Sequence, residues 1–206
     1  FICQLDLETK IIRVMPKLQK SKDKKAALLQ ASLTLINEGG IQGASMAKVA
    51  KMANVSPGTI YIYFKNKQDL VNQLYLQIKQ TFSEKAFEGY QEGLPIKESF
   101  ELIWCNIAHF KINYLPESSF LSQCDNTPII DRESREKGLI HLQPLLDLWE
   151  LGKKKGIIKK ISPYLLYAYT IYPMAFLLNK QYCEHLTLNK EKLNEAFVSA
   201  WDSIKV

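Results

Sequence analysis

Long apolar runs are absent from this sequence. Its most apolar stretch, residues 163–178, is shorter than the roughly 18 residues that a membrane-spanning helix needs, and it contains Pro173. We therefore expect a buried helix there and no membrane partner. Asp6 and Glu8 interrupt any apolar core of a signal peptide, so the sequence predicts a cytoplasmic protein.

The chemical motifs of enzymes and metal sites are also absent. The four cysteines form no C-x-x-C pair, which is typical of reduced thiols, and there is no Gly-rich phosphate loop, H-E-x-x-H or G-x-S-x-G. Cys105 and His109 are four residues apart and would share a helix face. No third ligand, orienting acid or oxyanion loop accompanies them. We therefore predict no metal site, no cofactor and no enzymatic activity.

Strand-like alternation is nearly absent as well, whereas apolar residues recur with the period of a helix. This pattern predicts an all-α fold. Charge is distributed unevenly along the chain: residues 1–67 hold 11 Lys and Arg against 4 Asp and Glu, and residues 68–206 hold 16 against 17. A basic head on a nearly neutral body indicates that the head meets a polyanion.

The apolar periodicity and the breaks at glycine and proline define the expected helices. We expect a first helix over residues 22–38, stopped by Gly39 and Gly40, two short helices between Ser45 and Lys67, and a long one over about 67–87. Further helices are expected over residues 97–114, 117–125, 130–142, 144–155, 163–184 and 189–205, with a kink at Pro173.

The stretch from Ser45 to Lys67 predicts a helix-turn-helix. Ser45 is suited to cap the first short helix, and Ser56 caps the second, with Pro57 at its first position. Ala50 is small enough for the helix crossing, and Asn54 tolerates the left-handed conformation of a tight turn. Ile60 would anchor the second helix from below, together with Val55 and Phe64. The residues left on the outer side are Ser56, Gly58, Thr59, Tyr61 and Tyr63.

The run Ser56-Pro57-Gly58-Thr59-Ile60-Tyr61-Ile62-Tyr63-Phe64, followed by Lys65-Asn66-Lys67-Gln68-Asp69-Leu70, resembles the recognition helix of the TetR family of bacterial transcriptional regulators. The resemblance covers about residues 24–75. It implies that Ser45 and Lys48 flank the DNA groove, that Ser56, Gly58, Thr59 and Ile62 face bases, and that Tyr61, Tyr63 and Lys67 hold phosphates. Ile62 departs from the aromatic or polar residue that the family often has there.

The same resemblance implies that the body pairs with a second copy and encloses an effector pocket. The residues 163–184 and 189–205 would form the homodimer interface, with Phe176, Leu193, Phe197, Trp201 and Ile204 as contacts. The candidate pocket residues are Trp104, His109, Phe110, Tyr114, Phe120, Gln123, Cys124, Trp149, Tyr167 and Phe176. For any single aromatic among them, plain core packing is the competing interpretation.

We therefore expect an extension at residues 1–20, a helix-turn-helix DNA-binding domain at 21–67 and a helical effector-binding and dimerisation domain at 68–206. Met15 could be the natural start, and we give residues 1–14 no functional weight. The favoured function is a ligand-responsive regulator, most simply a repressor, that binds duplex DNA as a homodimer and is released by a small, partly apolar effector. Two alternatives stay open: a DNA-binding protein whose body docks a protein partner, and an all-helical enzyme or carrier.

Overall fold

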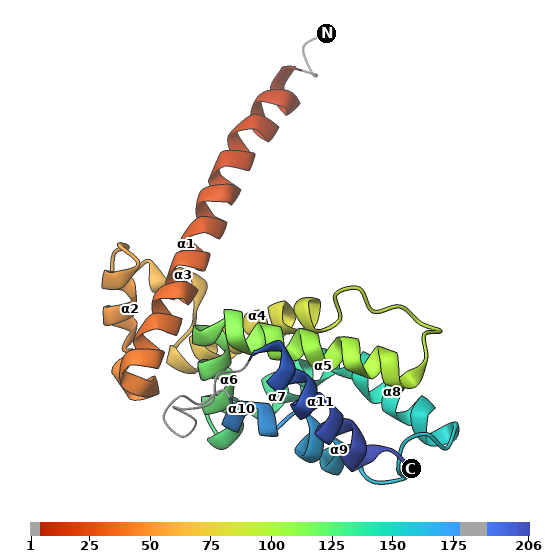
Figure 1. The fold of residues 1–206 in the computed structure, drawn as a ribbon. Coiled ribbons are helices and arrows are strands. Elements are labelled where there is room, and N and C mark those ends of the chain that lie inside the picture. The colour runs from red at the N-terminus through yellow and green to blue at the C-terminus, as the bar shows by residue number, and fades with distance from the viewer. Residues whose placement is uncertain (1–4, 178–188) are drawn as a thin grey trace. The chain divides into compact units, whose positions relative to one another are not determined.

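The computed structural model describes the backbone of residues 5–177 and 189–206, and their side chains from residue 20 onward except at 126. All elements of this part are helices, apart from an isolated antiparallel bridge between Ile158 and Lys205 (Figure 1). The helices are α1 (Leu5–Gly43), α2 (Met46–Met52), α3 (Ile60–Tyr63), α4 (Lys67–Ala86), α5 (Ile96–Asn113), α6 (Leu115–Asn126), α7 (Arg132–Ile140), α8 (Gln143–Lys154), α9 (Pro163–Thr170), α10 (Pro173–Leu177) and α11 (Lys190–Ile204). The expected all-α fold is thus confirmed.

The chain divides into two compact units, Phe1–Leu74 and Tyr75–Val206, which we call the head and the body. The division falls within α4, whereas the sequence pattern placed the boundary between Lys67 and Gln68. None of the described helices is long and apolar enough to cross a membrane.

In the head, α1 presents one row of buried apolar residues to the core. Leu28, Leu29, Leu33 and Ile36 are all nearly inaccessible to solvent. The expected stop at the two glycines is confirmed, because Gly40 has a φ of 65° and a ψ of 177°, outside the helical range. A residue without a Cβ adopts this backbone without strain. One further helical turn follows the kink and leads to α2.

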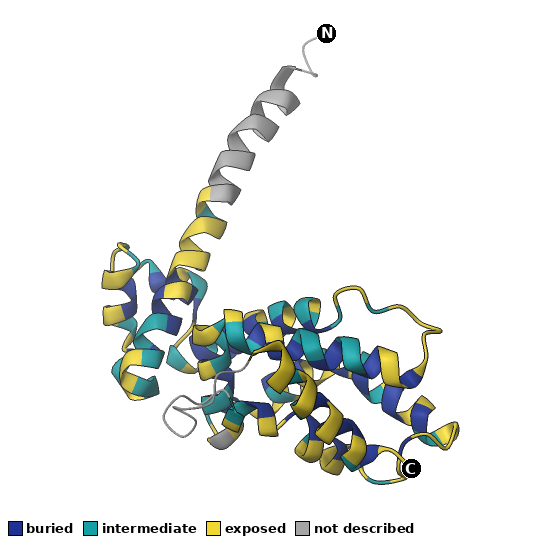
Figure 2. Cartoon of the chain, viewed as in Figure 1, coloured by how far each residue is buried: buried dark blue, intermediate teal, exposed yellow. Residues whose placement is uncertain are grey.

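In the body, the core is built around α5. Phe100 of α5 packs against Trp149 of α8 and against Phe197 and Trp201 of α11, with ring centroids 6.0–6.4 Å apart. Trp104, one turn further along α5, meets Phe197 edge-on at 5.7 Å. Buried positions concentrate along α5 and on the inner sides of α8 and α11 (Figure 2).

The long helix expected over residues 163–184 is interrupted, as Pro173 predicted. α9 ends at Thr170 and α10 begins at Pro173, because proline has no N–H to donate to the preceding turn. The remainder of that expected helix, from residue 178, lies outside the described residues.

Candidate nucleic-acid interface and body surfaces

The helix-turn-helix begins at the cap that the sequence predicted. The Ser45 side chain accepts a hydrogen bond from the backbone N–H of Lys48 at 3.3 Å, which satisfies one of the free donors at the start of α2. Ala50 is completely buried, as its place at the helix crossing requires. Asn54 has a φ of 52° and turns the chain through the left-handed region.

The segment after the turn differs from the expected helix. Residues 57–59 form a tight turn, and regular helix begins only at Ile60, so α3 has four residues. The turn is closed by a hydrogen bond from Thr59 N–H to Ser56 C=O at 2.9 Å, and the two hydroxyl groups of Ser56 and Thr59 lie 2.7 Å apart. Ser56 therefore binds the Thr59 side chain and does not cap a longer helix. Thr59 itself makes no capping bond.

The inner side of α3 is fixed to the rest of the head. Ile60 and Phe64 are completely buried, which confirms their expected role as anchors. The Lys25 ammonium of α1 lies 5.9 Å from the centroid of the Phe64 ring. The hydroxyl of half-buried Tyr63 lies 3.2 Å from Ser21 Oγ, a contact that the sequence did not reveal. This contact ties α3 to α1, and the phosphate contact expected of Tyr63 stays a prediction.

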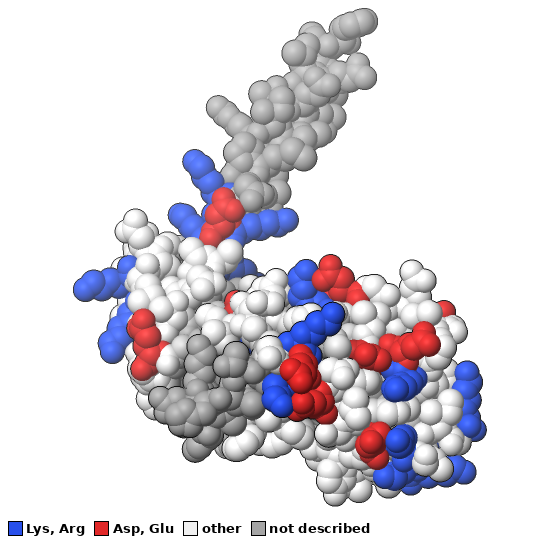
Figure 3. Space-filling view, viewed as in Figure 1, with Lys and Arg blue, Asp and Glu red and all other residues white. Residues whose placement is uncertain are grey.

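The outer side of α3 is exposed and carries both apolar and polar side chains. Tyr61 is 59% exposed, and Ile62 is 79% exposed. Ser45, Lys48, Ser56 and Gly58 are also exposed, and Thr59 is half-buried. On the face drawn in Figure 3, basic side chains project from the head beside a few acidic ones, and both signs also occur over the body.

The start of α4 carries the reciprocal cap that the sequence indicated. The Asn66 side chain accepts from the Asp69 N–H at 2.9 Å, and the Asp69 carboxylate accepts from the Lys65 N–H at 2.8 Å. Lys67, the first residue of α4, is half-buried. The cap fixes where α4 begins, directly after the recognition segment in the sequence.

Half of the candidate pocket residues fill the core of the body. Trp104, Phe110, Phe120, Cys124 and Trp149 are each at most 2% exposed. Trp104 Nε1 donates to the Thr170 carbonyl at 3.0 Å, and Phe110 stacks on Tyr114 at 5.0 Å. Burial raises the pKa of the Cys124 thiol to about 12, so this thiol is neutral at physiological pH.

Two candidates lie at the surface of the body. His109 is exposed, and Phe176 is 60% exposed. Gln123 and Tyr167 are half-buried, and burial raises the pKa of Tyr167. In the described part of the chain, no three His, Cys, Asp or Glu residues gather closely enough to hold a metal ion.

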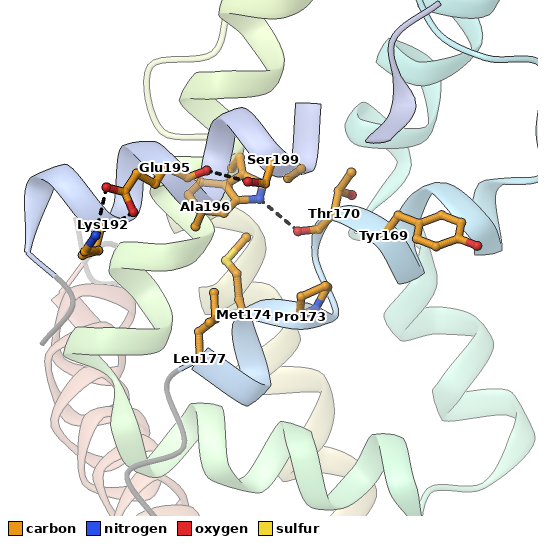
Figure 4. Close-up of a pocket in the computed structure, with 11 residues that line it drawn as sticks. Tyr169, Thr170, Pro173, Met174, Leu177, Lys192, Glu195, Ala196 and Ser199 are labelled. Carbon is orange, nitrogen blue, oxygen red and sulfur yellow. Dashed lines mark hydrogen bonds and ion pairs between the residues drawn. The ribbon is translucent and has the colours of Figure 1, made fainter. Parts of the chain in front are cut away.

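A partly open cavity of about 410 Å³ lies between α9, α10 and α11 (Figure 4). Trp104 is the one residue of the expected pocket set that lines it. The Glu195 carboxylate, paired with Lys192 Nζ at 2.8 Å, lies at one end of the cavity. The other lining residues are Tyr169, Thr170, Pro173, Met174, Leu177, Ala196, Ser199 and Ala200.

Three of the residues expected at a dimer interface are buried within the body. Phe197, Trp201 and Ile204 are 2%, 7% and 0% exposed, and the rings of Phe197 and Trp201 lie against Trp104 and Phe100 of α5. Leu193 is half-buried. The periodicity of the sequence predicted one apolar stripe on this helix. It could not show whether the stripe packs within the chain or against a second copy.

A different set of apolar side chains in this part of the body is exposed to solvent. It consists of Leu165, Tyr169, Tyr172, Phe176 and Val198, which are between 44% and 60% exposed, and we call it the outer stripe. Leu165 and Tyr169 lie one turn apart on α9, Tyr172 lies in the turn that follows, and Phe176 lies on α10.

Two family models match this chain, one in the head and one in the body. The sequence model described as "Bacterial regulatory proteins, tetR family" matches residues 28–74. A second model, described as "Tetracyclin repressor-like, C-terminal domain", matches residues 95–205, more than half of the chain. The chain belongs to the TetR family. It is therefore a transcriptional regulator with a DNA-binding domain.

Individual relatives of this TetR-family regulator support the assignment over nearly its whole length. A helix-turn-helix transcriptional regulator of Haemophilus influenzae is 26% identical over 191 residues, which cover 91% of this chain and 98% of the relative. The regulator YhgD of Bacillus subtilis is 28% identical over 70% of this chain and 77% of its own length. A TetR-family structure from Marinobacter aquaeolei VT8 shares the fold, with a TM-score of 0.84 at 22% identity, covering 91% and 98% of the two chains.

Proposed function

We propose that this TetR-family regulator is a repressor that binds a palindromic operator as a homodimer and is released by a small, partly apolar effector. The observation that carries the proposal is the recognition segment, residues 56–64, which has one buried side and one exposed side. Its inner residues Ile60 and Phe64 are fully buried, whereas its outer residues Tyr61 and Ile62 are exposed on a basic head.

Each outer residue has a role that its chemistry suits. Ile62 offers an apolar contact to a thymine methyl group in the major groove. The Tyr61 hydroxyl and the Lys67 ammonium bind phosphates on either side, since hydroxyl and ammonium groups commonly fix a protein on the duplex. Gly58, together with Ser56 and Thr59, lets the backbone approach the bases. This part of the proposal assigns Ser45 and Lys48 to the edge of the groove.

The homodimer is proposed to form through the outer stripe. Exposed aromatic side chains that lie side by side are uncommon on monomers and favour a protein partner. A single helix-turn-helix reads few base pairs, and two heads related by a twofold axis would read half-sites about one helical turn apart. The outer stripe replaces the buried residues that the sequence pattern suggested.

The effector response rests on thermodynamic linkage. α4 begins in the head and ends in the body, so a ligand that changes the body's preferred conformation can change the spacing of the two heads. A ligand that binds better to the conformation with badly spaced heads weakens the affinity for DNA. DNA must then weaken the affinity for the ligand by the same factor. A coupling of about 1–3 kcal/mol, or roughly 5- to 150-fold, is ordinary for such proteins.

The test is DNA binding measured by fluorescence anisotropy on duplexes selected from a random library. A dimer that contacts several phosphates loses about 10³- to 10⁵-fold in affinity between roughly 50 and 200 mM salt. Tyr61→Phe and Lys48→Ala should weaken binding to all sequences without unfolding the head. Lys160→Ala removes an equally exposed lysine from the body and is the matched control. A flat salt response, or equal effects of Lys48→Ala and Lys160→Ala, would contradict the proposed interface.

A further inference from the structure

The cavity between α9, α10 and α11 lies along one face of α11. Its α11 residues recur at intervals of three and four, which places them on one side of that helix. Three of them have small side chains, and the volume of about 410 Å³ is left beside them (Figure 4). The α11 residues of the cavity are Lys192, Glu195, Ala196, Ser199 and Ala200.

Part of the cavity wall is apolar and suits an aromatic ligand. Trp104 of α5 and Met174 of α10 line the cavity, and they are 1% and 3% exposed. An indole ring packs well against a second aromatic ring, and a methionine sulfur makes favourable contacts with such a ring. A cavity of about 150 Å³ holds one benzene ring, so the volume of about 410 Å³ holds two fused rings with a short side arm.

The neutral polar side chains of the wall use their protons on backbone carbonyls. Trp104 Nε1 donates to the Thr170 carbonyl at 3.0 Å, and Thr170 Oγ1 donates to the Leu166 carbonyl at 2.6 Å. Ser199 Oγ donates to the Glu195 carbonyl at 2.9 Å. The two hydroxyl oxygens keep lone pairs that can accept a hydrogen bond, whereas their protons are already in use.

One end of the cavity adds a charged acceptor. The two oxygens of the Glu195 carboxylate accept from Lys192 Nζ at 2.9 and 2.8 Å. An exposed ion pair of this kind contributes little stability, so a ligand can bind Glu195 in place of Lys192 at little cost. An anionic ligand group that approached Lys192 would meet the Glu195 carboxylate at the same place.

The remaining polar groups of the described wall do not reverse this balance. Pro173 has no N–H to donate. The Tyr169 ring points away from the other labelled side chains in Figure 4. The described wall therefore favours a ligand that donates hydrogen bonds over one that only accepts them.

We propose that this cavity is the ligand site of the body, and that its ligand is a compact aromatic molecule with a hydroxyl or amine group and no anionic group. The rings would lie against Trp104 and Met174. A hydroxyl would donate to Ser199 Oγ, and an ammonium group would donate to the Glu195 carboxylate. The inference rests on the proposed ligand response where it takes this ligand for the effector.

The first test compares probes that share a naphthalene ring and differ in the head group. Naphthylethylamine, naphthylethanol and naphthylacetate are titrated into the full chain, without DNA, by isothermal titration calorimetry. The amine, the alcohol or both should bind at least tenfold more tightly than the acetate, because the acetate brings acceptors to a wall of acceptors. The tighter of the two distinguishes an amine ligand from an alcohol. Equally tight binding of the acetate, or no binding of any probe, would overturn the proposal.

Filling variants then assign the binding to the cavity. Ala196→Leu places three further carbon atoms in the cavity and should weaken binding of the tighter probe at least tenfold, because it takes the space of the rings. Ala168→Leu makes the same change at an exposed alanine of α9 that does not line the cavity, and it should leave binding unchanged. If Ala196→Leu does not fold, as judged by circular dichroism, Ser199→Leu at an exposed position carries the test.

Polar variants test the two head groups separately. Glu195→Gln removes the charge but keeps an oxygen acceptor, so it should weaken binding of the amine about tenfold and leave the alcohol nearly unchanged. Ser199→Ala should weaken binding of the alcohol by about 2- to 10-fold, as expected for one hydrogen bond, and leave the amine nearly unchanged. Ser119→Ala removes an exposed serine from α6 and is the matched control.

Unchanged binding by the folded filling variant, or by both polar variants, would overturn the cavity site. A separate anisotropy titration on selected duplex DNA tests the ligand response. Binding that is lost in Ala196→Leu and leaves the DNA affinity of the parent chain unchanged would support the cavity site and contradict the ligand response. Release of DNA by a probe that binds the parent chain and Ala196→Leu equally well would support the ligand response and overturn the cavity site.

Discussion

Ile60→Ala and Ile62→Ala make the same chemical change two residues apart, on opposite sides of α3. Ile60 is 0% exposed and Ile62 is 79% exposed. The substitution removes three carbon atoms, which at about 0.8 kcal/mol per buried methylene amounts to about 2.4 kcal/mol at the buried position. The cavity left behind brings the expected loss for Ile60→Ala to about 2–5 kcal/mol.

At the exposed position, the substitution should change the affinity for DNA more than the free energy of unfolding. Ile62→Ala should change the free energy of unfolding by no more than about 0.5 kcal/mol, as is usual for surface substitutions. It should weaken binding to a selected operator by about 1–3 kcal/mol, because one base-edge contact is lost, and should leave binding to unrelated duplexes unchanged.

Urea unfolding followed by circular dichroism measures the first quantity, and fluorescence anisotropy at fixed salt measures the second. Ile60→Ala should lose affinity for all duplexes in parallel with its loss of folded head. The assignment of inner and outer sides would be refuted if Ile62→Ala unfolded the head, or if it bound the selected operator as tightly as the parent chain.

Three further predictions concern the body. Tyr169→Asp on the outer stripe should keep the fold and yield monomers by sedimentation at low micromolar concentration, and a dimer of this variant would refute the interface. Trp201→Ala should instead lower the free energy of unfolding by about 3–5 kcal/mol, because Trp201 packs inside the body. Gly138→Ala would place its Cβ 2.6 Å from the Tyr75 ring and should cost about 1–3 kcal/mol in urea unfolding, and an unchanged midpoint would contradict this packing. Cys124, buried and with its pKa raised to about 12, should react with iodoacetamide at pH 8 only after unfolding, as measured by mass spectrometry; labelling of the folded chain would show that the thiol is accessible.

Local signals in the sequence were sufficient to predict the caps and the turn of the head. The Ser45 cap, the left-handed Asn54 and the pairing of Asn66 with Asp69 each depend on residues within a few positions of one another. Such features can be derived from side-chain chemistry alone. The short length of α3 was missed, because the Ser56–Thr59 hydroxyl contact competes with the cap that the same serine could have formed.

The body was harder to predict, because its site residues depend on which helices pack together. The apolar stripe of α11 is the same whether it meets a second copy or α5, and Trp201 meets α5. His109 lies among apolar residues in the sequence yet is exposed. Lys79 shows the same difficulty, because it is buried on the apolar face of α4 between Tyr75 and Phe82 although lysine is usually exposed.

The four-residue length of α3 has a consequence for how operator preference can change. A helix this short is not stable alone, and here its shape is imposed by the buried Ile60 and Phe64 and by the Tyr63–Ser21 contact. Positions 61 and 62 contribute little to that support, so they can vary with almost no loss of folding. A library randomised at these two positions would therefore remain largely folded, and selection on it would sample new DNA preferences on an unchanged scaffold.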